Sequence, residues 1–317
     1  MNDHPSQERL PSIQVNEGRL VLLSWVGLFA IAALNNFSLV SILVRGGALD
    51  ETVSFGGGAV GLILGITVYS LPGACFVTYL AAGRRHAVTI GFLLIPLLIG
   101  NAPSGMARFH AAAIYIAIAV TLFSSLRRSS ILLPAGLILG ILVAFPTLNQ
   151  FRSYEGGVPR IYILGIDDVT TGHFDSFQSI AGALNMPLTM GRQLLGVVLF
   201  WVPRSVWPDK PIGTGAEYAD HANLSFSNIS MNFFAEGVVN FGLLGAIAFA
   251  AVGGYLSALI DSRGYSQTPS LFWAVFSKFM IGMAFFMMRG DLLSSFAFSV
   301  GIAVTVHIVI LFSTKRI

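Results

Sequence analysis

Eight long apolar segments dominate the hydrophobic pattern of the chain, and short polar stretches separate most of them. An α-helix needs roughly 20 apolar residues to cross a bilayer. The pattern therefore predicts transmembrane helices at residues 20–44, 57–82, 87–103, 109–126, 130–148, 237–260, 271–288 and 292–313. The third and fourth segments are close to the minimum length for crossing.

One long polar segment, residues 149–236, interrupts this pattern and holds eight of the fifteen acidic residues. Within it, the apolar run 193–202 is too short to cross a bilayer, so we expect it to dip into the interface or lie along it. The chain thus divides into a bundle of five predicted spans (1–148), an outward-facing loop with short interfacial helices (149–236) and three further spans (237–317).

Composition agrees with an all-α, polytopic membrane protein of about eight spans. Hydrophobic residues make up 55% of the 317 residues and charged residues 10%, against about 25% charged residues in soluble domains. The short alternating segments of a transmembrane β-barrel do not occur. The single cysteine, Cys75, lies in an apolar run, and no Cys/His spacing typical of a metal site is present. The net charge of +3 does not indicate nucleic-acid binding, because many cations flank the spans.

The distribution of Lys and Arg predicts the orientation. With the N-terminus inside, the cytoplasmic stretches hold nine cations and the short outer loops hold three, Arg45, Arg108 and Arg289. This positive-inside bias places both termini in the cytoplasm and residues 149–236 on the outer face. The nine inner cations are Arg9, Arg19, Arg84, Arg85, Arg127, Arg128, Arg263, Lys315 and Arg316.

Cations on the predicted outer face form the first group of candidate binding residues. A cation at a span end often only reaches the lipid headgroups. Several cations around one loop also suit a phosphate-bearing ligand, because Arg provides forked hydrogen bonds and Lys a point charge. The candidates are Arg152, Arg160, Arg192, Arg204, Lys210 and Arg289.

The stretch WVPRSVWPDKP, residues 201–211, combines three prolines with two of these cations. Its prolines fix φ and remove backbone donors, which predicts an extended or turned loop. Trp201 and Trp207 are typical of interfacial anchors, and an indole ring can also stack against a sugar. Both roles remain open for Trp207.

A polar stripe follows this loop. Asn228, Asn232, Glu236 and Asn240 recur every four residues, which predicts that they share one face of a helix. Such groups near membrane depth often line a cavity, and they also serve as hydrogen-bonded contacts between helices. Gly242 and Gly245 would permit close packing of a neighbouring helix.

The candidate proton acceptors are His221 and Glu236. A neutral histidine suits proton transfer from a hydroxyl, and His221 lies between the cation-rich stretch and the polar stripe. Asp291 is expected to pair with a cation of the loop. Other titratable groups of the loop are Asp167, Asp168, His173, Asp175, Glu217 and Asp220.

These motifs in combination resemble the O-antigen polymerases, also called oligosaccharide repeat unit polymerases. The similarity covers about residues 148–295, and members of this family usually have ten or more spans. Arg152, directly after a predicted span, fits the pattern as well. The matching residues are Pro203, Arg204, Trp207, Pro208, Lys210, Pro211, Glu236, Asn240, Phe241, Gly242, Gly245, Arg289, Gly290 and Asp291.

The resemblance implies a GT-C-like glycosyltransferase of the bacterial inner membrane with a periplasmic loop. It would transfer a growing glycan from undecaprenyl diphosphate to a sugar hydroxyl of a new lipid-linked repeat unit, with inversion and without a cofactor or metal. Arg152, Arg192, Arg204, Lys210 and Arg289 would bind substrate, together with Asn232, Asn240 and Trp207. A chain-length regulator and a flippase are partners that the resemblance suggests.

Two other functions remain open from the sequence. A ligase would use the same parts and transfer the glycan to a different acceptor. A transporter or flippase of anionic lipid-linked glycans should carry ionisable residues deep in several spans, and Lys278 in the seventh span is one such residue.

Overall fold

The computed structural model describes residues 15–44, 58–123, 125, 126, 129, 131–150, 165, 176–225, 229 and 231–314. These residues are all-α apart from one isolated bridge between Val15 and Thr314. The helices of the first half are α1 (Glu17–Leu34), α2 (Leu39–Leu43), α3 (Ala59–Ala81), α4 (Ala87–Gly100), α5 (Arg108–Leu122), α7 (Leu132–Leu139), the π-helix η1 (Gly140–Ala144) and α8 (Phe145–Asn149). Those of the second half are α10 (Ser176–Ala183), α11 (Arg192–Val198), α12 (Thr214–His221), α13 (Phe233–Gly264), α14 (Leu271–Arg289) and α15 (Leu292–Ser313).

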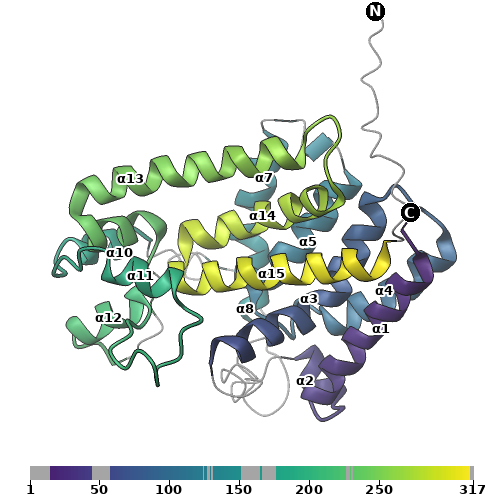
Figure 1. The fold of residues 1–317 in the computed structure, drawn as a ribbon, viewed down its shortest axis with the longest axis horizontal. Helices are drawn as coiled ribbons and strands as arrows, with labels where there is room; N and C mark the ends of the chain where they lie inside the picture. Colours follow the sequence, from purple (N-terminus) through teal and green to yellow (C-terminus); the bar gives the residue numbers. More distant parts are fainter. Residues whose placement is uncertain are drawn as a thin grey trace, which may run out of the picture.

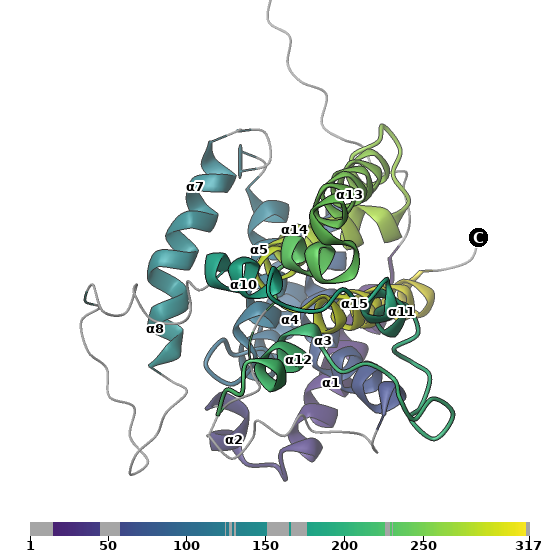
Figure 2. The same ribbon diagram turned by 90° about the vertical axis from the view of Figure 1, so that its left-hand side faces the viewer.

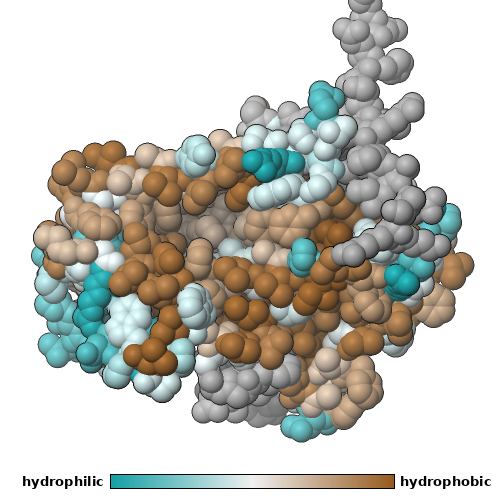
Figure 3. All heavy atoms as spheres, viewed as in Figure 1, coloured by the Kyte–Doolittle hydropathy of each residue, from teal (hydrophilic) through white to brown (hydrophobic). Residues whose placement is uncertain are grey.

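Five of these helices, α1, α3, α13, α14 and α15, are long and apolar enough to cross a membrane. This confirms the prediction of a multi-pass, all-α membrane protein. Three shorter apolar helical runs, α4, α5 and the run from Leu132 to Leu148, coincide with the other predicted spans. Hydrophobic residues cover the middle of the molecule in Figure 3, and hydrophilic residues gather towards its left edge, where Figure 1 places α12.

Helix α3 lies at the centre of the bundle and packs against α1, α4, α5 and α15, while α14 packs against α5, α13 and α15. The largest hydrophobic cluster joins α1, α3, α4, α5, α14 and α15. Its fully buried side chains include Tyr79, Leu93, Ile114 and Phe279.

The two ends of the described chain meet at one end of the bundle. The backbone N–H of Asn16 donates to the Ser313 carbonyl at 2.8 Å, and Arg19 donates to the Phe312 carbonyl at 3.3 Å. Helices α10, α11 and α12 lie at the opposite end (Figure 1). The helices of the loop predicted to face outward therefore lie at the other end of the bundle from the first turn of α1 and the last turn of α15.

Two predicted spans differ from the prediction in detail. The pattern predicts a first span that continues to residue 44, but α1 ends at Leu34 and the short α2 follows it. The cause is a turn in which Asn36 and Phe37 have φ values of 52° and 56°, and two successive left-handed residues cannot continue a right-handed helix. The fifth span contains the π-helix η1 between α7 and α8.

Helix α13 is a hairpin of two arms rather than one continuous rod. Phe241 and Gly242 break it, with Gly242 at φ 69° and ψ −159°. The first arm, residues 233–240, folds back on the second, residues 243–264. The rings of Phe233 and Phe249 lie 5.3 Å apart, and a Cβ on Gly245 would overlap the Gly237 carbonyl oxygen. The second arm, about 33 Å long at 1.5 Å per residue, can cross a bilayer alone.

A lateral cleft of about 350 Å³ separates α5 from the run α7–η1–α8. Figure 2 shows α7 and α8 standing apart from the rest of the bundle. The lining is almost entirely apolar, with Arg108 and Tyr115 among the few polar residues. Further lining residues are Ala112, Ile116, Leu133, Gly136, Leu137 and Phe285.

Candidate functional site

The cation-rich stretch 201–211 forms a compact series of turns, as its prolines predict. The backbone N–H groups of Val206 and Trp207 both donate to the Pro203 carbonyl at 3.0 Å, and Lys210 donates to the Trp207 carbonyl at 3.2 Å. Pro211 closes the stretch by packing on α11, where a Cβ on Gly196 would meet the Pro211 ring at 3.1 Å. The loop is thus fixed to a helix rather than extended.

Three of the predicted substrate-binding cations hold this loop together. Arg204 donates to the Lys210 carbonyl at 2.8 Å, and Arg192 donates to the Asp209 carbonyl at 2.8 Å. The Lys210 ammonium donates to the carbonyls of Phe200 and Val202 at 2.6 and 2.9 Å. A guanidinium has five N–H donors, so these contacts leave donors for a ligand, and Arg192 and Arg204 are exposed.

The electrostatics of the loop favour an anion. Partial burial lowers the pKa of Lys210, and the neighbouring Arg204 lowers it further. Two cations that repel each other at a surface gain from a ligand that carries negative charge. The Trp207 side chain is half-buried beside them, a position compatible with an anchor or a stacking surface.

Glu236 is the buried acid of the site. It lies in the first arm of α13 and is 1% exposed. Its Oε2 accepts a hydrogen bond from the Thr214 hydroxyl at 2.7 Å, and its Oε1 accepts one from the Leu292 backbone N–H at 3.2 Å. Glu236 therefore joins the first turns of α12 and α15 to α13.

Asp291 lies beside Glu236, close enough for the two carboxyl groups to repel each other and to form a hydrogen bond when one is protonated. Its Oδ2 caps α15 by accepting from the Ser294 backbone N–H at 3.1 Å. A Cβ on Gly213 would lie 3.0 Å from both carboxylate oxygens of Asp291, so a side chain there would press on the carboxylate. The expected pairing of Asp291 with a loop cation is not seen among the described residues.

The loop leads directly into this carboxyl pair. Lys210 precedes Gly213 by three residues, which limits the distance between their Cα atoms to about 11 Å. Arg289 ends α14 two residues before Asp291 and is half-buried. The structure thus brings together Glu236, the loop that carries Arg204 and Lys210, and Asp291, which the sequence does not place beside Glu236.

The two asparagines of the predicted polar stripe have structural contacts. Asn232 is the N-cap of α13 and accepts from the N–H groups of Phe234 and Ala235 at 3.1 and 2.9 Å. Asn240 is fully buried. It accepts from the Leu194 N–H at 3.1 Å and donates to the Glu236 carbonyl at 2.9 Å, which docks α11 on α13. Contacts of both residues with substrate remain predictions.

His221, the other predicted proton acceptor, lies at the last residue of α12, exposed and without a hydrogen-bonding partner among the described residues. Thr214, bonded to Glu236, begins the same helix. The rise of 1.5 Å per residue puts the backbones of these two residues about 10 Å apart. His221 therefore lies at the opposite end of α12 from the residue that binds Glu236. We treat His221 and Glu236 as alternative proton acceptors and not as two groups that act on the same hydroxyl.

Some predicted residues lie outside the described part of the chain: Arg152, Arg160, Asp167, Asp168, His173, Asp175 and Asn228. The predicted polar stripe is only partly helical: α13 begins at Phe233, Asn232 is its N-cap, and only Glu236 and Asn240 of the stripe lie within the helix. Within the described residues, no three His, Cys, Asp or Glu side chains gather in a way that could hold a metal ion.

We compared the chain with known families, curated proteins and solved structures. No known protein family, no curated protein and no solved structure matches the chain.

Proposed function

We propose that this chain is an integral-membrane glycosyltransferase that extends glycans carried on a lipid diphosphate at the outer membrane surface. The observation that carries the proposal is the junction of the Arg204–Lys210 loop with the carboxyl pair Glu236–Asp291 at one end of an apolar helix bundle. A basic loop suits a diphosphate, and a neighbouring carboxylate suits removal of a proton from a hydroxyl. The motif resemblance to the O-antigen polymerases supports the same activity.

The chemistry uses these groups in two roles. The acceptor hydroxyl loses its proton to a carboxylate, and its oxygen attacks the anomeric carbon of the donor glycan. The bond from that carbon to the diphosphate breaks, and the electron pair leaves with the diphosphate, whose developing charge Arg204 and Lys210 stabilise. In-line attack gives inversion at the anomeric carbon, so a product with retained configuration would contradict this mechanism.

The lateral cleft between α5 and α7 is the place proposed for the lipid chain of the donor. Its lining is almost entirely apolar, and the helices that line it are apolar helices proposed to lie in the membrane. Gly136 lines the cleft, and a Cβ added there would meet nothing within 4 Å, so Gly136→Phe is a variant designed to narrow the cleft. It is expected to reduce polymer yield, whereas Gly254→Phe, on the open face of α13, is a control that leaves the yield unchanged.

We place eight spans in the membrane, the five long helices and the three shorter apolar runs. The bundle then has both termini in the cytoplasm and α10–α12 in the periplasm of a bacterial inner membrane. This orientation rests on the positive-inside distribution and agrees with the meeting of the ends of α1 and α15 opposite α10–α12.

A transporter or flippase is the second candidate, because two ionisable residues lie buried inside predicted spans. His110 is 4% exposed and hydrogen-bonded to Ser70 at 2.7 Å, and Lys278 is 7% exposed and donates to the Ala274 carbonyl at 2.7 Å. Each has a partner in the bundle. Hydrogen bonds within and between helices also explain why both residues are buried. A transport function does not explain the cation-rich loop at residues 201–211.

A polysaccharide gel from a strain that lacks this chain separates the candidates. Surface lipid capped with single repeat units indicates a polymerase, as proposed. Loss of all surface glycan indicates a ligase or a flippase and would contradict the polymerase function. An unchanged ladder of chain lengths would contradict all three.

A further inference from the structure

Outside the contacts described so far, one polar atom of the site is unexplained. Asp291 Oδ1 is buried and has no hydrogen-bond donor among the described residues. The other oxygen, Oδ2, accepts from the Ser294 backbone N–H at 3.1 Å and from the Ser294 hydroxyl at 3.3 Å. A buried acceptor without a donor is destabilising, so its presence requires a reason.

The neighbouring groups provide one. The Glu236 carboxyl lies beside Asp291, and each of its oxygens already accepts one hydrogen bond, from Thr214 or from Leu292. Within the described part of the chain, neither carboxyl forms an ion pair with a cation. Two adjacent carboxylates in a buried site do not both stay ionised, and one proton held between them removes the repulsion and supplies the missing donor.

We propose that Glu236 and Asp291 share one proton, and that Asp291 is the group that takes the proton of the acceptor hydroxyl. Asp291 is partly exposed, whereas Glu236 is 1% exposed and shielded by Thr214 and Leu292. Asp291 can therefore touch a substrate, and Glu236 is a positioning residue that holds the Asp291 carboxyl through the shared proton. The second part of this inference rests on the proposed glycosyltransferase function.

The proton balance is simple. The O–H bond of the acceptor sugar breaks, an O–H bond forms on the Asp291 carboxylate, and the electron pair of the broken glycosidic bond leaves with the diphosphate. The proton then passes to solvent through the exposed side of Asp291. Other charged groups near the pair are Arg289, two residues before Asp291, and on the Gly213 side Lys210 and Glu217.

The surroundings of the pair support a fixed rather than an accidental approach. Three helices converge on it, α12 through Thr214, α13 through Glu236 and α15 through Asp291 and Leu292. Gly213 gives the Asp291 carboxylate its space, since a Cβ there would lie 3.0 Å from both oxygens. The N-cap role alone does not require a carboxylate at residue 291, because Asn caps a helix as well as Asp does. The charge at this position therefore needs an explanation besides capping.

Infrared spectroscopy of the purified chain in lipid nanodiscs at neutral pH tests the shared proton without any substrate. The wild-type protein is expected to show a protonated-carboxyl C=O band at a frequency lowered by the hydrogen bond to a charged carboxylate. Glu236→Gln is expected to lose the band, because Asp291 then ionises. In Asp291→Asn the buried Glu236 keeps its proton, and its band is expected to move to higher frequency, because a neutral amide is a weaker acceptor than a carboxylate. An unchanged band frequency in Asp291→Asn would mean that the Glu236 proton is held by burial alone and would overturn the shared proton. Asp261→Asn, at the other end of α13, is the matched control and should keep the band.

The polysaccharide ladder of cells that carry each variant tests the assignment of roles. Asp291→Asn is expected to lower polymer formation by about 10²- to 10⁴-fold, the usual contribution of a general base, and Glu236→Gln by less. A larger loss in Glu236→Gln than in Asp291→Asn would overturn Asp291 as the proton acceptor. If the wild-type chain makes no polymer, the proposed function fails, and the infrared band still decides whether the proton is shared.

Discussion

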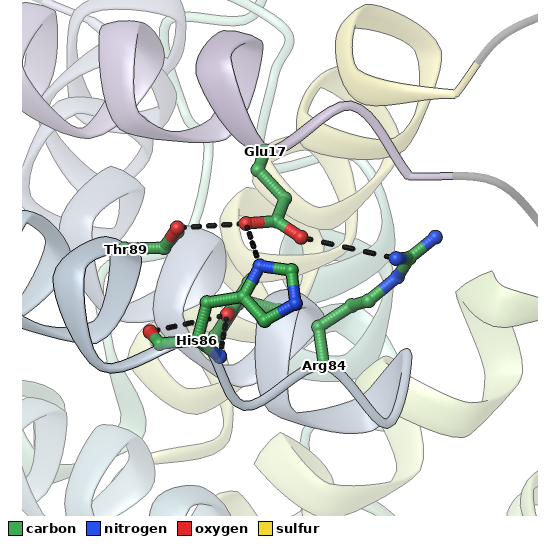
Figure 4. Close-up of polar contacts among 5 residues, drawn as sticks. Glu17, Arg84, His86 and Thr89 are labelled. Atoms are coloured by element: carbon green, nitrogen blue, oxygen red, sulfur yellow. Dashed lines mark hydrogen bonds and ion pairs between the residues drawn. The ribbon is translucent and has the colours of Figure 1, made fainter.

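The two ends of the bundle each hold a partly or fully buried glutamate, and the two glutamates have opposite surroundings. At the end where α1 and α15 meet, Glu17 accepts from the Thr89 hydroxyl at 2.7 Å, and a guanidinium and an imidazole flank it (Figure 4). His86 Nδ1 lies 3.2 Å from its carboxylate and the Arg84 guanidinium lies 3.9 Å away. Glu17 therefore joins α1 to the connection between α3 and α4 in the manner of an ordinary surface ion pair.

At the other end, Glu236 has a second carboxyl as its neighbour and a hydroxyl and a backbone N–H as its donors. Stability alone favours the Glu17 arrangement, since opposite charges attract and like charges in a buried site repel. The proposed function assigns the chemistry to this end, where like charges lie beside a cation-rich loop, and leaves the other end a role in the fold. Substitutions at the two ends should therefore separate activity from stability.

The largest expected effect is at Asp291. Asp291→Asn removes the repulsion and keeps a good N-cap for α15, so the free energy of unfolding should not fall, while polymer formation falls by about 10²- to 10⁴-fold. Thermal unfolding of the purified protein and the polysaccharide ladder measure the two quantities. A destabilised Asp291→Asn protein would show that the carboxylate serves the fold, and the contrast between the ends would disappear.

Arg204→Gln is expected to have the next largest effect. The Gln side chain keeps an N–H donor but is two bonds shorter than Arg, and the charge on the diphosphate side is lost. Loss of a charged hydrogen bond of about 1.5–3 kcal/mol corresponds to about a 10- to 150-fold lower rate. Arg263→Gln, at the far end of α13 over the Trp273 ring at 5.9 Å, is the matched control. Equal loss of polymer in both variants would argue against a diphosphate contact for Arg204.

Glu17→Gln should have a small effect of the opposite kind. It removes the exposed contacts with Arg84 and His86, which are worth about 0–1 kcal/mol, and it keeps an acceptor for Thr89. The free energy of unfolding in a denaturant titration is expected to fall by that amount, with the polymer ladder unchanged. A strong loss of polymer would place functional chemistry at the end where Glu17 lies instead.

His221→Ala should have the smallest effect. The side chain is exposed at the end of α12, about 10 Å along the helix from the residue that binds Glu236, and surface substitutions usually change stability by less than about 0.5 kcal/mol. The ladder of chain lengths is expected to match the wild type. Collapse of the ladder to single units would make His221, rather than Asp291, the proton acceptor.

Local patterns in the sequence predict much of the fold. The apolar segments are helical where the pattern predicts helices, because bilayer-length apolar runs have few alternatives. The run 193–202 stays short, as α11, and the prolines of residues 201–211 give a turned loop. Gly245 does permit a close approach, although the partner is the first arm of α13 and not a separate helix, whereas Gly242 adopts a φ of 69° at the turn between the two arms.

Contacts between distant residues are beyond the reach of such patterns. Glu236 and Asp291 are 55 positions apart, and no periodicity relates them, so their approach depends on how α13 and α15 pack. The role of Asn240 in docking α11 depends on the same packing. The position of Asp291 gives no signal for the pair, because an Asp directly before a helix is an ordinary N-cap.

Reconstitution tests the central claim most directly. The purified chain, in proteoliposomes supplied with lipid-diphosphate-linked repeat units extracted from cells that carry it, should convert single units into a ladder of longer glycans and release the lipid diphosphate, with no nucleotide sugar present. Asp291→Asn protein in the same vesicles should leave the units single. Single units after incubation with folded wild-type protein would contradict the proposed glycosyltransferase function.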